Sequence, residues 1–375
     1  MKVVVAIDSF KGSLSSMQAG HAAREGILRA HPDALVTVRP LADGGEGTTE
    51  ALIEGFGGDR ITVQAVGPLG DLVPAQYGLL TESSMAVIEM AAASGITLVK
   101  EKVPLRATTR GVGEMILDAA GRGARSFLIG IGGSATNDGG IGMLKALGWQ
   151  FLTEDGLDAG EGADALLRIA AIIPPDQERV NLLSECSFRI ACDVTNPLCG
   201  PRGATFVYGP QKGLSKEQLS PVDQAMSHYA DVTASFLGQD NRGCPGAGAA
   251  GGLGFALVSY LHAELSPGVQ LVLDAVKLED DLKDADILVT GEGRLDAQTV
   301  MGKAPIGAAR LAKKHGLTVV AVAGSAAPEA YACNAAGIDA FFPILREVCP
   351  LEEAMRPETA YANLAATAEQ IFRLL

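Results

Sequence analysis

The sequence is poor in positive charge, in aromatic side chains and in long apolar runs. Its 375 residues hold 30 Lys and Arg against 44 Asp and Glu, a formal net charge of −14. Proteins bind nucleic acids through clustered Lys and Arg side chains, so no nucleic-acid partner is expected. No stretch of eighteen uninterrupted apolar residues occurs, so no membrane partner is expected either. With 5% aromatic residues and a single tryptophan, Trp149, no stacking platform for adenine stands out.

Several common catalytic signatures are also absent. The six cysteines form no C-x-x-C pair and the five histidines lack metal-ligand spacing, which argues against a zinc site. The G-x-S-x-G motif of serine hydrolases and the H-R-D and D-F-G motifs of protein kinases do not occur. The P-loop motif fails because Gly302-Lys303 is followed by Ala304. Without a signal-peptide core, the chain is expected to be cytoplasmic, with reduced thiols.

The composition that remains is that of a globular protein of two domains. Hydrophobic residues make up 47% and charged residues 20% of the chain, which is too apolar for a disordered segment. A length of 375 residues exceeds the usual size of one domain. The 46 glycines follow no triplet period, which excludes collagen and predicts many tight loops.

Short apolar strands alternate with amphipathic helices at both ends of the chain. The predicted strands are 3–7, 35–40 and 60–66 near the N-terminus and 287–290, 318–323 and 340–343 near the C-terminus. Such alternation predicts a parallel sheet with crossover helices. The glycine-rich middle of the chain has a different pattern, although three consecutive units would look similar. We therefore predict an α/β fold in which residues 1–68 and 266–375 form one discontinuous parallel-sheet domain and residues 69–265 form an inserted α/β domain.

Five polar, glycine-rich segments follow predicted strands. They are residues 8–13, 43–47, 130–142, 193–200 and 291–303. Loops at the carboxyl ends of parallel strands are where α/β proteins bind ligands. Glycines let backbone N–H groups approach a ligand, and a following helix N-terminus favours negative charge. The five segments therefore predict a site for an anionic ligand.

The third segment carries the most information. Residues 130–140 spell G-I-G-G-S-A-T-N-D-G-G directly after a predicted strand, so a run of open amides and two hydroxyls could hold a phosphate group. The same residues match the dinucleotide fingerprint G-x-G-x-x-A. A second loop at 137–140 interrupts the helix that this fingerprint requires, so we disfavour a dinucleotide site. A further G-x-G-x-x-G in residues 246–251 has no strand before it, and a packed connector explains it equally well.

The same loops supply the charged groups that phosphoryl transfer requires. Carboxylates can bind Mg²⁺ and accept the proton of the attacking hydroxyl, and cations can neutralise the phosphoryl group. Taken singly, an Asp at a strand end is more often a turn former and a lysine more often a surface residue. The recurrence of carboxylates beside glycine in all five loops favours a functional site.

Taken together, these motifs resemble those of the bacterial glycerate kinases of the first type. The matching segments are 8–15, 42–48, 130–140, 193–198, 245–254 and 290–303. The resemblance covers nearly the whole chain. It implies a flavodoxin-like domain built from both chain ends, with the active site in the cleft between the two domains.

The resemblance also implies an activity, an ATP- and Mg²⁺-dependent phosphorylation of D-glycerate. The implied product is 2-phosphoglycerate, in glyoxylate or sugar-acid catabolism, although the residues leave 3-phosphoglycerate open. A nicotinamide-dependent oxidoreductase and a two-lobed organic-acid binding protein are the alternatives. The expected partners are small molecules only, and the chain is expected to be a monomer or a homodimer.

Roles for individual residues follow from their chemistry and position. Three residues are predicted to be catalytic, with Asp193 as the first choice for the general base and Asp8 an alternative Mg²⁺ ligand. The predicted catalytic residues are Asp193, Lys11 and Asp8; those for phosphate or nucleotide are Gly132, Gly133, Ser134, Asn137, Gly291 and Lys303; those for substrate are Ser9, Arg110, Asn196 and Arg294; and those for metal are Asp43 and Glu292.

Overall fold

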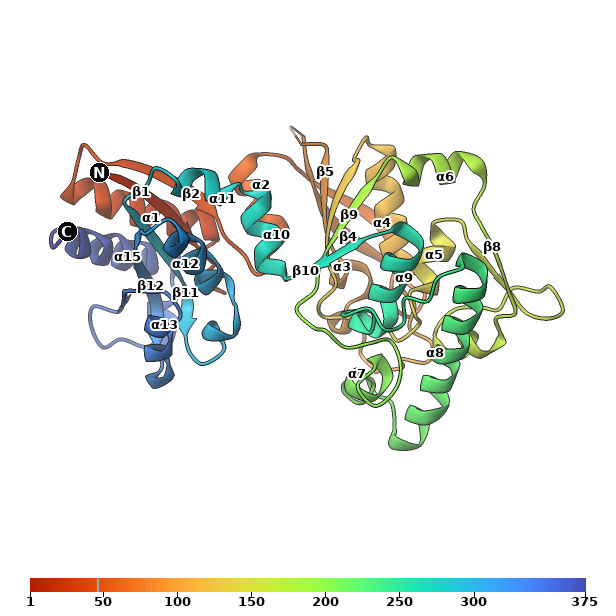
Figure 1. Ribbon diagram of the computed structural model, residues 1–375. Helices are drawn as coiled ribbons and strands as arrows, with labels where there is room; N and C mark the ends of the chain where they lie inside the picture. The colour runs from red at the N-terminus through yellow and green to blue at the C-terminus, as the bar shows by residue number, and fades with distance from the viewer. Residues whose placement is uncertain (46, 82) are drawn as a thin grey trace. The chain divides into compact units, whose positions relative to one another are not determined.

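The chain folds into two compact units, seen in a computed structural model that describes residues 1–45, 47–81 and 83–375. Unit 1 comprises Met1–Gly57 and Val269–Leu375, and unit 2 comprises Gly58–Gly268. Both ends of the chain therefore belong to unit 1 (Figure 1). The α/β fold with an inserted second unit is as predicted. Glu46, in the second of the predicted loops, lies outside the described residues.

Unit 1 is built on a sheet of five parallel strands flanked by helices. The strands are β1 (Lys2–Ile7), β2 (Leu35–Pro40), β11 (Ile287–Leu295), β12 (Thr318–Ala326) and β13 (Ala340–Pro343). The α-helices are α1 (Ser16–Ala30), α2 (Thr48–Phe56), α10 (Gly268–Ala275, which begins in unit 2), α11 (Leu278–Leu282), α12 (Ala304–Lys314), α13 (Ala332–Ala335), α14 (Leu351–Ala354) and α15 (Pro357–Phe372), and the 3-10 turns are η4 (Thr299–Met301) and η5 (Pro328–Tyr331).

The strand order of this sheet is β2-β1-β11-β12-β13, and all neighbouring pairs are parallel. Counted along unit 1, this is the order 2-1-3-4-5 of the flavodoxin-like fold, as predicted. The order reverses between β1 and β11, because β2 lies on one side of β1 and every later strand on the other. Ligands of such sheets bind outside the carboxyl ends of the strands at this reversal.

Helices α1 and α15 lie side by side on one face of the sheet (Figure 1). Their apolar residues form a common core with alternate residues of β1, β11 and β12, including Val3, Val5 and Val322. Gly26 allows the two helices to approach closely, because a Cβ there would lie 2.0 Å from the carbonyl oxygen of Ala365. The apolar stripe of α1, which includes Ala19, Ala23 and Ile27, therefore has a packing role.

One buried hydroxyl joins the ends of two strands beneath the ligand-binding edge. The hydroxyl of Ser16 donates a hydrogen bond of 2.7 Å to the carbonyl of Ile7 and accepts one of 2.8 Å from the N–H of Leu41. A capping box opens the helix, with Ser15 and Gln18 bonded reciprocally. The start of α1 thus fixes the loops that follow β1 and β2.

Unit 2 contains a mixed six-stranded sheet and a small two-stranded one. Its strands are β3 (Asp59–Val66), β4 (Leu72–Leu80), β5 (Met85–Glu89), β6 (Ser126–Gly130), β7 (Gln150–Leu152), β8 (Ala171–Ile173), β9 (Ser187–Ala191) and β10 (Glu264–Ser266). Its helices are α3 (Ala91–Ser94), α4 (Arg110–Gly121), α5 (Ile141–Ala146), α6 (Gln177–Ser184), α7 (Ala204–Lys212), α8 (Lys216–Leu237) and α9 (Leu253–Leu261), and its 3-10 turns are η1 (Ile96–Leu98), η2 (Ala163–Arg168) and η3 (Ala249–Gly252).

The larger sheet of unit 2 has the order β10-β9-β6-β5-β4-β3. Strands β5, β6, β9 and β10 run parallel to one another, whereas β4 is antiparallel to both β3 and β5. The loops after β6 and β9, which begin near Ile131 and Cys192, therefore leave the sheet at the same edge. The long helix α8 begins at a capping box formed by Ser215 and Gln218.

The boundaries between the units differ from those expected from the sequence. We predicted residues 1–68 and 266–375 for the discontinuous domain, but the first boundary falls at Gly57/Gly58 and the second at Gly268/Val269. The reason for the first difference is β3, which pairs along its whole length with β4 of unit 2. The sequence of a short strand that follows a helix does not indicate which of two sheets the strand will join.

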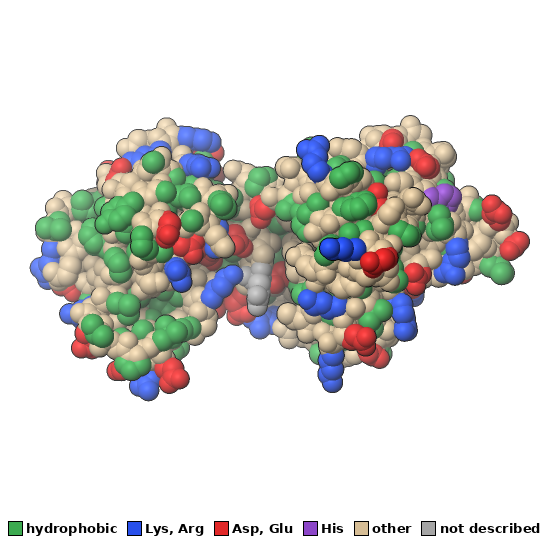
Figure 2. All heavy atoms as spheres, turned by 90° about the horizontal axis from the view of Figure 1, so that it is seen from below, with side chains coloured by type: hydrophobic (Ala, Val, Ile, Leu, Met, Phe, Trp, Pro, Cys, Tyr) green, Lys and Arg blue, Asp and Glu red, His purple; other side chains and the backbone are tan. Residues whose placement is uncertain are grey.

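The surface agrees with the composition. On the face drawn in Figure 2, acidic and basic side chains are intermingled over both units, with apolar side chains between them. Within the described part of the chain, no helix combines the length and the apolar character needed to cross a bilayer.

We expect Gly26→Ala to destabilise unit 1 by about 1–3 kcal/mol, the usual range for overpacking a close contact. The added methyl group would have to displace the backbone of α15 at Ala365. Thermal unfolding followed by circular dichroism measures the effect. Gly121→Ala at the end of α4 is the control, because a Cβ there meets nothing within 4 Å. Equal melting shifts for the two variants would contradict the close-packing argument.

Candidate active site

A pocket of about 360 Å³ lies at the carboxyl edge of the unit 1 sheet. It contains charged residues from the loops after β1 and β2, from the end of β11 and from the segment that follows β11. These charged residues are Asp8, Lys11, Asp43, Glu292, Arg294, Asp296 and Lys303. The pocket therefore lies at the reversal of strand order, where the fold predicts a ligand.

Asp8 is the most perturbed carboxylate of this pocket. Burial, with the negative charges of Asp43 and Glu292 adding to it, raises the pKa of Asp8 to about 7. The N–H of Ser9 donates a hydrogen bond of 2.6 Å to its Oδ1, and this bond and Lys11 oppose the rise. A carboxylate in this state can exchange a proton near neutral pH, or can be ionised by a bound cation.

Glu292 lies on the neighbouring strand and is only 7% exposed. Burial raises its pKa, while a hydrogen bond of 2.7 Å from the hydroxyl of Thr299 and the nearby charge of Lys303 act in the opposite direction. The ammonium group of Lys303 lies 4.0 Å from the Glu292 carboxylate. Glu292 is therefore held in place by the segment that follows its own strand.

Cations face the same pocket. Lys11 is exposed, and Arg294 is 66% exposed in its side chain and lies 3.6 Å from Asp296. With Lys303, the pocket has three cationic and four acidic side chains. The small excess of negative charge favours a site that holds a metal ion together with an anion.

The carboxylates fit Mg²⁺ better than a metal that requires a full set of protein ligands. Among the described residues, no three acidic, His or Cys side chains converge closely enough to ligate one ion. Mg²⁺ normally keeps several waters and takes one or two carboxylates besides the phosphates of a substrate. Asp8, Asp43 and Glu292 supply suitable oxygen atoms around one pocket.

The glycine-rich loop after β6 presents open amides in unit 2. Gly132 and Gly133 are exposed, and Gly133 has a positive φ of 72°. Backbone hydrogen bonds from Ile96 to Gly133 and from Ala135 to Ser94, of 2.8 and 2.9 Å, fix the loop against the segment after β5. Within the described residues, the N–H groups of Gly132, Gly133 and Ser134 donate no hydrogen bond. The loop can thus offer three amides to an anion.

A buried lysine, Lys212 at the end of α7, holds this loop from beneath. Its ammonium group donates hydrogen bonds of 2.6 Å to the hydroxyl of Ser134 and 2.6 Å to the carbonyl of Thr136. Lys212 is only 3% exposed. Burial lowers its pKa to about 7, against the attraction of Asp138. No sequence signal marked this residue, because most lysines are exposed.

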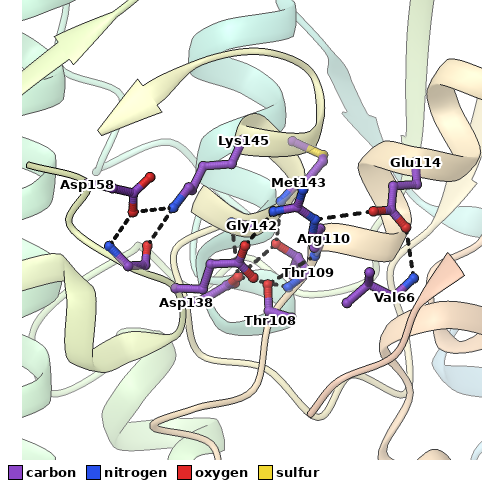
Figure 3. A network of polar contacts seen from close by, with 12 residues as sticks. Val66, Thr108, Thr109, Arg110, Glu114, Asp138, Gly142, Met143, Lys145 and Asp158 are labelled. Atoms are coloured by element: carbon purple, nitrogen blue, oxygen red, sulfur yellow. Dashed lines mark hydrogen bonds and ion pairs between the residues drawn. The ribbon is translucent and has the colours of Figure 1, made fainter. Parts of the chain in front are cut away.

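Asp138 organises the remainder of the loop (Figure 3). Its fully buried carboxylate accepts hydrogen bonds from the N–H and the hydroxyl of Thr109, both of 2.8 Å, and from the N–H groups of Gly140 and Gly142. Burial raises its pKa, although these hydrogen bonds oppose the rise. Asp138 therefore joins the loop to the start of α4 and has a structural role.

The predicted substrate ligand Arg110 follows Thr109 in the same network (Figure 3). Its guanidinium group pairs with Glu114 at 3.2 Å and with Glu161 at 2.7 Å. Because these two carboxylates already pair with the guanidinium group, the contacts of the Arg110 side chain in this structure are structural ones. Its role in binding substrate stays a prediction.

Two predicted residues lie in the loop after β9. One carboxylate oxygen of Asp193 accepts a hydrogen bond of 3.0 Å from the N–H of Gly268, the last residue of unit 2. The amide of Asn196 donates to the carbonyl of Arg202 at 2.8 Å and accepts from the hydroxyl of Tyr208 at 2.6 Å. Both side chains are therefore held by their own unit.

The predicted residues thus fall into two groups. Those in unit 1 that line the pocket are Asp8, Ser9, Lys11, Asp43, Glu292, Arg294 and Lys303. Those of unit 2 are Arg110, at the start of α4, and Gly132, Gly133, Ser134, Asn137, Asp193 and Asn196, in its loops. The remaining predicted residue, Gly291, lies on β11 of unit 1 and does not line the pocket.

Two predicted phosphate ligands have evident packing roles. The carbonyl of Gly291 accepts a hydrogen bond of 2.8 Å from the N–H of Asp8, and a Cβ at Gly291 would lie 2.0 Å from the carbonyl oxygen of Val322. Asn137 is buried and donates to the hydroxyl of Thr205 at 3.0 Å. The roles predicted for both residues in binding phosphate stay predictions.

Comparisons with known proteins agree on one family. The model of the glycerate kinase family matches residues 3–375. The chain is 46% identical to a glycerate kinase of Bacillus subtilis (strain 168) over 368 residues, covering 98% of this chain and 96% of that protein. It is 43% identical to a glycerate 2-kinase of Escherichia coli (strain K12) over 378 residues, covering 99% of this chain and 97% of that protein. A solved structure from Salmonella typhimurium LT2, described as a glycerate kinase 2, has a TM-score of 0.90 at 44% identity and covers 99% of this chain and 97% of its own.

We expect the stability of unit 2 to depend on pH through Lys212. Its pKa of about 7 lies below the usual 10.5, so between these values the unfolded chain binds a proton that the folded chain lacks. The free energy of unfolding therefore rises with pH in this window, by up to about 1.4 kcal/mol per pH unit. Lys212→Met removes this dependence, so the wild type gains stability relative to the variant from pH 7 to pH 9.

Urea unfolding followed by the fluorescence of Trp149, which lies in unit 2, measures this difference. Lys216→Met changes an exposed lysine at the start of α8 and is the matched control. It should follow the wild type at every pH. A difference between the wild type and Lys212→Met that stays constant with pH would rule out the titration of Lys212.

Proposed function

Because this chain belongs to the glycerate kinase family, we propose that it transfers the γ-phosphoryl group of ATP to a hydroxyl group of D-glycerate. The product would be 2-phosphoglycerate, and the likeness to a protein named glycerate 2-kinase supports this hydroxyl over the neighbouring one. An oxygen–phosphorus bond forms to glycerate as the bond to ADP breaks, and the hydroxyl proton passes to a carboxylate. A role in glyoxylate or sugar-acid catabolism is part of the same proposal.

The observation that carries the proposal is the charged pocket of unit 1. Carboxylates and cations from three neighbouring strand ends meet there, at the place where this fold type binds ligands. An oxidoreductase of the nicotinamide type would need few carboxylates, and a simple receptor for an organic acid would not gather several of them around an anion. The pocket supports a metal-assisted phosphoryl transfer instead.

Three groups of the pocket have distinct proposed roles. Asp43 and Glu292 would hold Mg²⁺, with Asp8 as the alternative ligand, and the ion when bound would offset the charge of the phosphates. Lys11 would neutralise the transferring phosphoryl group or the carboxylate of glycerate. Arg294 and Lys303, which also face the pocket, would assist in these tasks.

The loops of unit 2 would supply the second set of contacts. The open amides of Gly132, Gly133 and Ser134 are suited to bind the phosphoryl group that is transferred. Asn196, Arg110 and Ser9 remain the proposed contacts to glycerate. An active site in the cleft between the two units stays a prediction.

A coupled assay with Mg²⁺, ATP and D-glycerate tests the function directly, and NMR of the product distinguishes 2- from 3-phosphoglycerate. ADP formation that depends on D-glycerate, with 2-phosphoglycerate as product, is the expected result. Turnover that requires NAD(P)H, or binding of glycerate without ADP formation, would overturn the proposal.

We expect Asp193→Asn to lower kcat by about 10²-fold or more, which is the usual scale for removing a general base. Initial rates at saturating ATP and glycerate measure it. Asp155→Asn is the control, because Asp155 is exposed in a loop of unit 2 that carries no predicted site residue. A near-normal kcat in Asp193→Asn would exclude Asp193 as the general base.

A further inference from the structure

The pocket of unit 1 has a second wall whose chemistry the proposed phosphate and metal contacts leave unexplained. Opposite in character to the charged wall, it is formed by the segment between β13 and the middle of α15. The apolar residues of this wall are Ile344, Leu345, Leu351, Ala354, Met355 and Ala360. One polar side chain from α15, Asn363, also lines it.

The two walls begin at different strands of the sheet. The charged groups come from the ends of β2, β1 and β11, and most of the apolar groups follow β13, two strands beyond β11. Met355 adjoins the loop after β1, because a Cβ on Gly12 would lie 3.0 Å from its Cε. Charged and apolar surfaces thus meet within one pocket.

The apolar wall is open to a ligand. Leu345 is 47% exposed and Leu351 is 73% exposed, although both line the pocket, while Phe10 and Ile344, which also line it, are buried. Within the described residues, the amide of Asn363 makes no hydrogen bond to the protein, so its donor and its acceptor are both available. A wall of this composition suits a flat, weakly polar ring with hydrogen-bonding edges.

We propose that this apolar wall binds the purine base of the nucleotide, so that the base lies in the same pocket of unit 1 as the proposed metal ligands and Lys11. A nucleoside triphosphate has the same distribution of charge as the pocket, with an uncharged aromatic base at one end and the anionic phosphates at the other. The pocket volume of about 360 Å³ is within the range of small-molecule sites. The inference rests on the proposed function only in taking the ligand to be a nucleoside triphosphate.

The test compares two probes on the full-length protein, Mg·ATP and inorganic tripolyphosphate with Mg²⁺, by titration calorimetry. Leu351→Asp puts a charge on an exposed position of the apolar wall, and Met355→Ala removes a contact from it. Both should weaken ATP binding by about tenfold or more, the effect of losing one large apolar contact. Met355→Ala, which changes no charge, should leave tripolyphosphate binding unchanged. Lys303→Met should weaken both probes.

Leu167→Asp is the matched control, because Leu167 is an exposed leucine of unit 2. It should leave the binding of both probes as in the wild type. Unchanged ATP affinity in Leu351→Asp and Met355→Ala, or an equal loss for ATP and tripolyphosphate, would overturn the inference.

Photo-crosslinking with 8-azido-ATP gives a second measurement that needs no variant. Label on peptides from residues 344–363 supports the inference, and label confined to unit 2 overturns it.

The proposed function and the placement of the base can be refuted independently of each other. Glycerate phosphorylation by apolar-wall variants with an unchanged ATP affinity would refute only the placement of the base. Tight ATP binding that these variants abolish, without phosphorylation of glycerate by the wild type, would refute only the proposed function.

Discussion

Parallel pairing of β1 with β2 on one side and with β11 on the other is the constraint on which the candidate site depends. In this register Ile7 lies opposite both Pro40 and Gly291. The next residues, Asp8 just after β1 and Glu292 within β11, therefore lie close together at this edge of the sheet, and Asp43 follows from β2. The backbone hydrogen bonds of the sheet thus bring together carboxylates that would repel one another in an unfolded chain.

Gathering like charges has an energetic cost, and the surrounding structure offsets it. In unit 1 the burial of Asp8 and Glu292 disfavours their charged forms, while the hydroxyl of Thr299 and the ammonium group of Lys303 stabilise Glu292. Ser16 holds the strand ends from beneath by bonding to both backbones. Such a site is organised before any ligand arrives, which is what electrostatic catalysis requires.

Unit 2 uses buried charge differently. Asp138 has four protein donors and Lys212 has two protein acceptors, so their charges serve the shape of the glycine-rich loop. The amides of that loop remain available, and the two buried side chains fix the backbone that carries them. One unit directs its charged groups into a pocket, and the other uses them to hold a backbone in place.

Much of this architecture could be predicted from the sequence because it depends on local patterns. Strand and helix periodicity gave the parallel sheet of unit 1, and glycine beside carboxylate marked the loops at the strand ends. The first unit boundary was wrong because the partner of β3 is decided by tertiary pairing with β4. Lys212 was missed because nothing local distinguishes a buried lysine, and the apolar wall was missed because Leu345 and Met355 lie in short irregular segments.

The discontinuity of unit 1 has a consequence for biosynthesis. β1 is an apolar strand in the middle of its sheet, yet its neighbour β11 is translated only after the whole of unit 2. At ribosomal rates of about 5–20 residues per second, the nascent strand waits about 14–56 seconds for this partner. All strands of unit 2 are synthesised before β11 of unit 1. Unit 2 can therefore fold on the ribosome before unit 1 does. The exposed first strand must meanwhile be kept from pairing with other chains.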